Sequence, residues 1–110
     1  MAVTLRTSYG DLPIRLECRI APRSARNFLE LSKSGYYDGV PVHRIVPGMC
    51  LQTGDPLGDG TGGESIWGAT FNDEISARLS HSGPGVVSMV SCCALRKQWL
   101  SLEHLRCLRY

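Results

Sequence analysis

Alternating apolar and polar residues open the chain. Val3 and Leu5 alternate with polar residues, and the alternation resumes at Ile14 after the turn signal Gly10-Asp11. Because successive side chains of a strand point to opposite faces, this pattern predicts a β-hairpin with one buried face.

One segment has the spacing of a helix. Ala25, Phe28 and Leu29 recur at the spacing of a helix face. Pro22 is suited to the first turn, and Gly35 can adopt the left-handed conformation that ends a helix. The sequence therefore predicts a helix over residues 22–34.

The remaining pattern favours short strands and turns. Apolar runs at residues 42–46 and 49–53 flank Pro47-Gly48, and a further run at residues 86–89 follows a Gly-Pro-Gly turn signal. Residues 54–63 predict a long, turn-rich loop. Asn72 and Asp73 are N-capping residue types, so we expect a second short helix from there through Leu79. The predicted fold class is mainly β with one or two helices.

Length and composition indicate one small domain. A chain of 110 residues matches the size of a single hydrophobic core. It has no apolar run of the ~20 residues that a membrane span needs, and its start lacks the basic and apolar regions of a signal peptide. Five cysteines are an odd number, which favours reduced thiols. We expect a cytoplasmic protein, with the nucleus as the alternative.

The net charge of +2 is unevenly distributed. Residues 1–89 hold eight Lys and Arg and nine Asp and Glu, whereas residues 90–110 hold four and one. The second segment also lacks Gly and Pro and carries three of the five cysteines. We predict a domain at residues 1–89 and a divergent, basic tail at residues 90–110. Because the tail lacks alternation, we expect it to supply neither strand nor helix.

Other site chemistries have weaker support. Gly58, Gly60 and Gly63 have the spacing of a dinucleotide fingerprint, but the βαβ context that it requires is absent. Cys50 and His43 could form a thiolate and base pair, yet a cysteine in an apolar strand is more often a small buried hydrophobe.

The tail offers two further alternatives. Four of its residues are zinc-ligand types, but two of them are adjacent, which suits tetrahedral coordination poorly: Cys92, Cys93, His104 and Cys107. The tail also carries four cationic residues and two aromatic residues, Trp99 and Tyr110. This set is a weak signal for nucleic-acid binding. We predict no metal, no cofactor, no nucleic-acid ligand and no membrane contact.

One stretch is specific enough to indicate a family. Residues 42–55, VHRIVPGMCLQTGD, resemble the FHRIIPGFMxQxGD stretch of cyclophilins, the peptidyl-prolyl cis-trans isomerases. The resemblance covers residues 1–89 and includes APRS at 21–24, GYYDG at 35–39, GTGG at 60–63, SIWG at 65–68 and FNDE at 71–74. Within the family the chain looks most like the small, single-domain members.

The resemblance implies a closed barrel of eight strands and an isomerase that acts on X-Pro bonds to assist protein folding. It implies that Arg44 is the catalytic arginine. The implied substrate-binding residues are Met49, Cys50, Gln52 and Gly60. The implied partners are proline-containing peptides or proteins, cyclosporin-type ligands and spliceosomal proteins, bound by a monomer.

The chemistry of the reaction suits these residues. Rotation about an X-Pro bond crosses a barrier of roughly 18–20 kcal/mol because amide conjugation is lost. A catalyst needs an apolar pocket for proline and a fixed donor to the twisted amide, so that this state is bound most tightly. Arg44 suits the donor role because a guanidinium stays charged and presents several N–H groups in one plane.

The sequence also departs from the family pattern. Val42 and Met49 replace phenylalanines, and Cys50 replaces a methionine, so we expect a thinner apolar floor under the proline. After Met89 the family's ANxGPNTNGSQFF segment does not follow. We therefore expect a barrel that is incomplete at its C-terminal end. A catalytically weak proline-motif binding module and a non-functional truncated product remain as alternatives.

Overall fold

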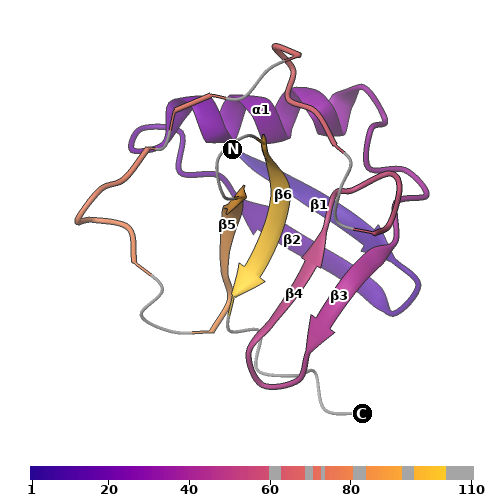
Figure 1. The fold of residues 1–110 in the computed structure, drawn as a ribbon. Coiled ribbons are helices and arrows are strands. Elements are labelled where there is room, and N and C mark those ends of the chain that lie inside the picture. Colours follow the sequence, from indigo (N-terminus) through magenta and orange to yellow (C-terminus); the bar gives the residue numbers. More distant parts are fainter. Residues whose placement is uncertain (60–62, 69–70, 73, 81–83, 93–95, 104–110) are drawn as a thin grey trace.

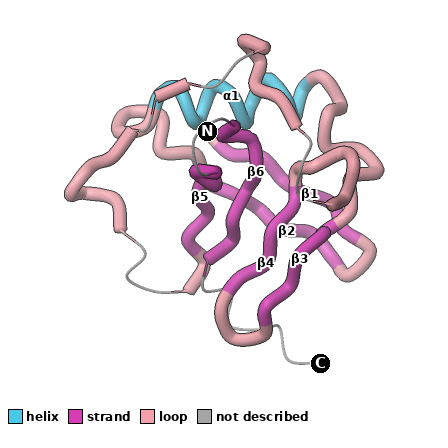
Figure 2. Tube along the Cα trace, viewed as in Figure 1, coloured by secondary structure: helices cyan, strands magenta, loops and turns pink. Residues whose placement is uncertain are grey.

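The computed structural model describes residues 1–59, 63–68, 71–72, 74–80, 84–92 and 96–103 (Figures 1 and 2). In chain order its elements are β1 (Ala2–Thr7), β2 (Gly10–Arg15), α1 (Pro22–Lys33), β3 (Val42–Val46), β4 (Cys50–Thr53), β5 (Val86–Cys92) and β6 (Arg96–Glu103). The expectation of a mainly β fold is confirmed. Within the described residues, no helix is long and apolar enough to cross a membrane.

The N-terminal hairpin follows its sequence pattern. β1 and β2 pair antiparallel from Ala2 opposite Arg15 to Thr7 opposite Gly10. The Thr7 hydroxyl donates to the Gly10 carbonyl at 2.7 Å and accepts the Tyr9 N–H at 3.2 Å, which closes the turn. The second strand ends at Arg15, so the alternation that continues through residues 16–18 extends beyond it.

The other four strands form one antiparallel sheet in the order β3-β4-β6-β5. β6 lies in the tail, so the expectation that the tail supplies no strand is wrong. A strand with a neighbour on each side is held by main-chain hydrogen bonds along both edges, and these bonds do not require alternating side chains. The predicted boundary near residues 89–91 falls within β5, and the division of the chain into domain and tail stays a prediction.

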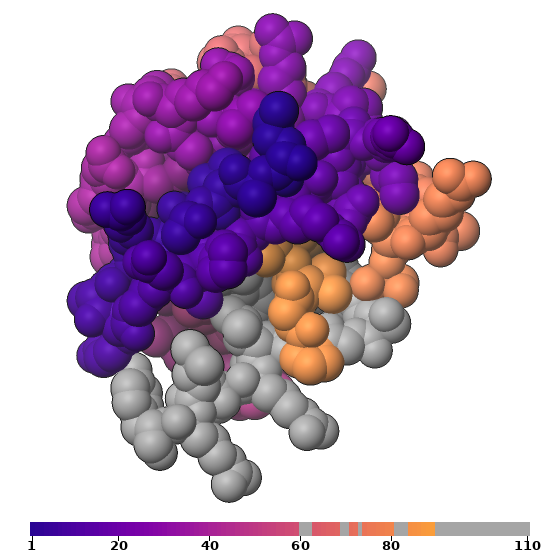
Figure 3. Space-filling view, turned by 180° about the vertical axis from the view of Figure 1, so that it is seen from behind, coloured from indigo at the N-terminus to yellow at the C-terminus, as the bar shows by residue number. Residues whose placement is uncertain are grey.

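The core lies between the hairpin, α1 and β5. Ile14 and Phe28 are buried at its centre. Partly buried apolar residues pack around them: Val3, Leu5, Leu16, Tyr37, Val87 and Met89. Seen from behind, the hairpin covers this side of the molecule and the segment that begins β5 lies beside it (Figure 3). Among the described residues no strand pairing joins the two sheets, so the structure does not show a closed barrel.

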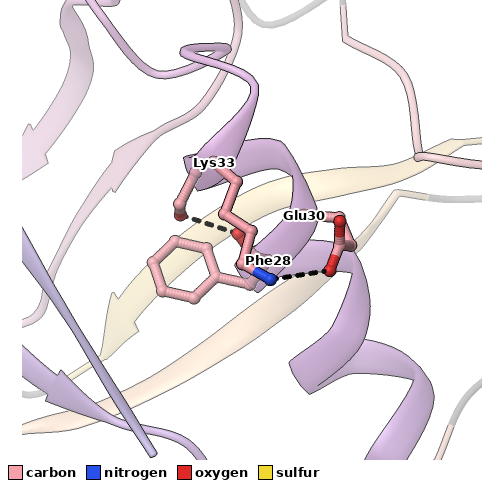
Figure 4. A network of polar contacts seen from close by, with 4 residues as sticks. Phe28, Glu30 and Lys33 are labelled. Carbon is pink, nitrogen blue, oxygen red and sulfur yellow. Dashed lines mark hydrogen bonds and ion pairs between the residues drawn. The ribbon is translucent and has the colours of Figure 1, made fainter.

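Helix α1 ends in a well-defined stop. In its last turns the Ser32 hydroxyl donates to the Phe28 carbonyl at 2.7 Å, and Lys33 pairs with Glu30 at 3.3 Å (Figure 4). Gly35 has a φ of 77°, and the N–H of the next residue, Tyr36, returns to the carbonyl of residue 31 at 3.1 Å. This is the Schellman motif, for which glycine is favoured because it lacks Cβ.

The start of α1 is capped by a residue far away in the sequence. Its N-cap residue, Ala21, has no side chain that can accept a hydrogen bond. Instead the Glu74 carboxylate accepts the N–H groups of Arg23 at 3.1 Å and Ser24 at 2.6 Å. Of the predicted second helix, residues 72 and 74–79 are described and are not helical, so the prediction is wrong for them. The bonds to α1 hold Glu74 outside any helix of its own.

We expect Glu74→Ala to lower the free energy of unfolding by about 1 kcal/mol because it removes the cap and a negative charge at the positive end of the helix. Urea denaturation measures this change. Glu17→Ala is the matched control, since among the described residues that carboxylate pairs with the exposed Arg15 and should contribute less than about 0.5 kcal/mol. Equal losses in the two variants would contradict the capping role.

Candidate functional site

The predicted site residues gather on the hairpin of β3 and β4. Arg44 lies directly opposite Gln52, and Val46 lies opposite Cys50. The register shifts between Val42 and Arg44, so one extra residue of β3 bulges there. Because opposed residues of antiparallel strands share a face, the side chains of Arg44 and Gln52 project from the same side of the sheet.

The predicted site residues differ in exposure. Arg44 is exposed, and Met49, in the turn between the strands, is 54% exposed. Gln52 is 9% exposed and Cys50 is 5% exposed, so both are buried. Gly60 lies outside the described residues. The structure thus brings Arg44 and Gln52 together, with Met49 in the turn of the same hairpin, while the functional role of each stays a prediction.

A thiolate and base pair is not favoured by this geometry. Cys50 pairs with Val46 across the strands and not with His43, which falls at the bulge. Burial of Cys50 fits the interpretation of a small apolar residue within β4. Among the described residues, no group of three or more His, Cys, Asp or Glu side chains could hold a metal ion.

The loop after β4 is organised by Asp55, a residue that sequence reasoning missed. Asp55 is fully buried, and its carboxylate accepts the N–H groups of Leu57 at 2.9 Å and Asp59 at 3.2 Å. Gly58 has a φ of 71°, and a Cβ there would lie 3.0 Å from the Pro41 ring. An Asp followed by Pro-x-Gly is a turn signal that indicates such bonding.

Tyr36 closes the base of the same loop and was also missed. Its hydroxyl donates to the Gly54 carbonyl and accepts the Glu64 N–H, each at 3.2 Å. Burial is the main cause that raises the pKa of Tyr36 above 10.0, and the negative charges of Glu64 and Asp55 raise it further against the opposing effect of the Glu64 N–H. One side chain therefore joins the start and the end of the loop.

The chain beyond this loop is fastened to α1. Asn27 is fully buried, and its carbonyl oxygen accepts the Ile66 N–H at 3.0 Å. Trp67 and Phe71 then form an edge-to-face pair, with ring centroids 5.2 Å apart. Together with the Glu74 cap, these contacts give the long connection between β4 and β5 defined points of attachment.

Comparison with known proteins identifies the family. The profile of "Cyclophilin type peptidyl-prolyl cis-trans isomerase/CLD" matches residues 2–96. The chain belongs to the cyclophilin family. The resemblance seen in the sequence is thereby confirmed.

Two relatives and one solved structure show the extent of the likeness. This cyclophilin is 54% identical over 91 residues to peptidyl-prolyl cis-trans isomerase-like 3 of Gallus gallus, covering 83% of this chain and 56% of that one. It is 49% identical over 89 residues to peptidyl-prolyl cis-trans isomerase cypE of Dictyostelium discoideum, covering 81% and 57%. The chain thus spans just over half the length of these relatives.

The fold is confirmed by a crystal structure of a Cryptosporidium parvum cyclophilin type peptidyl-prolyl cis-trans isomerase, solved in the presence of the dipeptide Ala-Pro. The TM-score is 0.89 at 38% sequence identity, and the match covers 94% of this chain and 68% of that one. The cyclophilin-like fold class is therefore established for the described part of the chain.

Removal of the hydroxyl should affect the free energy of unfolding differently at the adjacent Tyr36 and Tyr37. Tyr36→Phe leaves the Gly54 carbonyl and the Glu64 N–H without their partner, so we expect the free energy of unfolding to fall by about 1 kcal/mol. The Tyr37 hydroxyl is buried without a hydrogen-bond partner among the described residues, so Tyr37→Phe should be neutral or stabilising by up to about 1 kcal/mol. Urea denaturation at pH 7 compares them, and a larger loss for Tyr37→Phe would contradict both assignments.

Alkaline pH should destabilise the fold through Tyr37. Burial raises the pKa of Tyr37 well above 10.0, and the neighbouring Tyr36 raises it further. Above about pH 10 the unfolded chain loses this proton while the folded chain retains it, so stability falls as pH rises. We expect Tyr37→Phe to reduce the loss of stability between pH 9 and pH 11. An unchanged pH dependence would show that this phenol does not cause it.

Proposed function

We propose that this chain binds X-Pro segments and accelerates their cis-trans isomerisation on the face shared by Arg44 and Gln52. The observation that carries the proposal is their cross-strand pairing, which places an exposed guanidinium opposite a buried amide on the hairpin whose turn carries the apolar Met49. Family membership supports it, as does the relative solved in the presence of Ala-Pro.

Arg44 is the transition-state donor in this mechanism. As the X-Pro bond twists, its nitrogen loses conjugation and becomes a better hydrogen-bond acceptor, and the guanidinium donates to it. The bond is stronger in the twisted state than in either planar isomer, so it lowers the barrier instead of only tightening binding. Each 1.36 kcal/mol of this difference is worth about tenfold in rate. No nucleophile or covalent intermediate is needed.

Gln52 positions the peptide main chain in this mechanism. Its burial restricts its rotamers, and a side-chain amide offers both a donor and an acceptor to a peptide group. Met49 supplies an apolar surface for the proline ring, and its flexible thioether adapts to the ring where the family pattern has phenylalanine. Cys50 packs beneath as a small apolar residue, and Gly60 lines the adjoining subsite.

The substrates in this proposal are X-Pro segments of other proteins, so the reaction assists protein folding. The same groove would accept cyclosporin-type ligands. Spliceosomal proteins are the proposed partners, and the chain acts as a monomer in the cytoplasm or the nucleus.

Binding without turnover is the second candidate function. It is favoured by Met49, which stands where the family pattern has phenylalanine and gives a thinner apolar floor under the proline. A thinner floor still binds proline but excludes water less well, and this weakens the hydrogen bond on which turnover depends.

Isomerisation of a short Ala-Pro peptide, followed by NMR exchange at high protein concentration, tests the proposal. We expect Arg44→Ala to lower the catalysed exchange rate at least tenfold, because the donor is lost. We expect Arg44→Lys to restore little of it, since an ammonium does not reproduce the planar fork. Arg26→Ala is the control, because Arg26 is an exposed residue of α1 and should leave the rate unchanged.

Each outcome assigns the function. No rate increase, together with peptide-induced shifts at Gln52, would leave the binding module as the function. Catalysis that survives Arg44→Ala would overturn the role given to the guanidinium. Loss of activity in the Arg26 control would show that the loss reflects unfolding.

A further inference from the structure

A small pocket lies at the base of the loop after β4, and none of the named residues of the proposed site is among its described lining residues. Its described lining residues are Tyr36, Pro56, Leu57, Gly63 and Glu64, and its volume is about 250 Å³. Sites for drug-sized ligands occupy roughly 300–1,000 Å³. The volume therefore suits one long amino-acid side chain better than a whole small molecule.

The walls of the pocket are held in place before any ligand arrives. The Tyr36 hydroxyl bonds both the Gly54 carbonyl and the Glu64 N–H, which fixes the two ends of the loop against each other. The buried Asp55 carboxylate bonds the Leu57 N–H and so fixes the apolar wall. A pocket whose walls are already ordered loses less entropy when it binds.

The electrostatics of the pocket favour a cation. Glu64 is the charged member of the described lining, and residues 54–64 contain three acidic residues and no basic one. The pKa of Tyr36 responds to this charge, since Glu64 and Asp55 both raise it. This negative potential is local, because the whole chain carries a net charge of +2.

We propose that this pocket accepts the side chain of a lysine or arginine in the proline-containing substrate. The cation pairs with the Glu64 carboxylate, and its hydrocarbon stem lies along Leu57 and Pro56. The face of the Tyr36 ring adds a cation–π attraction. A neutral apolar side chain gains only the stem contacts, and an anionic one is repelled.

The position of the pocket makes the occupant part of the substrate. The inference rests on the proposed function, in which the peptide lies across Arg44 and Gln52. Gly54, which Tyr36 bonds, is two residues beyond Gln52, or about 7 Å along an extended chain. A peptide in the same extended form advances about 3.3 Å per residue. A basic residue two to four positions from the proline can therefore reach the pocket.

A peptide series tests this specificity on the full chain. The test peptides have a central Ala-Pro and are uncharged except for one lysine, which is placed two to four residues from the proline on either side. Matched peptides carry norleucine or glutamate there. We expect kcat/KM, measured by NMR exchange, to favour lysine over norleucine about two- to fivefold at one position, which is the range of an exposed ion pair. The preference should decline with added salt.

Variants of Glu64 assign the preference to the pocket. Glu64→Gln keeps the main-chain N–H that Tyr36 accepts and should abolish the lysine preference while leaving the norleucine peptide unaffected. Glu64→Lys should reverse the preference in favour of glutamate. Glu17→Gln is the control, because it removes a carboxylate that lies before the start of α1, is 43% exposed and is not among the described lining residues of the pocket. It should keep the lysine preference.

The outcomes separate the pocket from the proposed function. Isomerisation without any lysine preference, or with a preference that survives Glu64→Gln, overturns the pocket and leaves the function standing. If no peptide is isomerised, peptide affinities measured by NMR titration show whether the pocket binds lysine. Tighter, Glu64-dependent binding of a lysine peptide supports the pocket while the isomerase proposal fails, and equal affinities overturn the pocket as well.

Discussion

No described residue of the long connection between β4 and β5 lies in a strand, so its main-chain N–H groups need other partners, and the arrangement of the molecule depends on the side chains that bond several of them. Buried polar groups of a main chain must find a partner, because leaving one unsatisfied costs about 1–3 kcal/mol. Asp55, Tyr36 and Asn27 accept N–H groups along this connection. Glu74, which belongs to the connection, accepts two N–H groups of α1 in return.

These bonds explain why a polar set is buried in so small a protein. Asn27 and Asp55 are the largest fully buried side chains among the described residues, whereas the apolar core is centred on Ile14 and Phe28. The hairpin and the four-stranded sheet are held by their ladders and by that core. The connection that lines the pocket at the base of the loop after β4 is held by hydrogen bonds from α1 and from the segment after it. The geometry of this pocket therefore depends on polar contacts more than on apolar packing.

The sequence predicted those elements whose signals are local. The alternation around Val3 and Ile14 and the Pro22 to Gly35 frame of the helix each lie within one segment, and the hairpin and α1 appear there. The role of Tyr36 was missed because its bonds reach residues 18 and 28 positions away, whereas the turn signal that follows Asp55 could have indicated the local bonds of that carboxylate. The strand in the tail was missed for a related reason, since it pairs not only with the preceding β5 but also with β4, which lies far earlier in the sequence. The prediction of a second helix was wrong because the Glu74 carboxylate bonds the distant start of α1 and is held there outside a helix of its own.

The exposure of Arg44 determines how the proposed site can work. A hydrogen bond from an exposed guanidinium is weakened by water, whose dielectric reduces the interaction several-fold compared with a partly buried setting. A bound peptide that lies over Arg44 and Gln52 itself excludes water from the pair. Any contact that keeps the peptide in place then strengthens the bond to the twisted amide, even when it lies several residues away. With Met49 where the family pattern has phenylalanine, the apolar contact to proline contributes less to this, and contacts along the flanking peptide matter more for turnover.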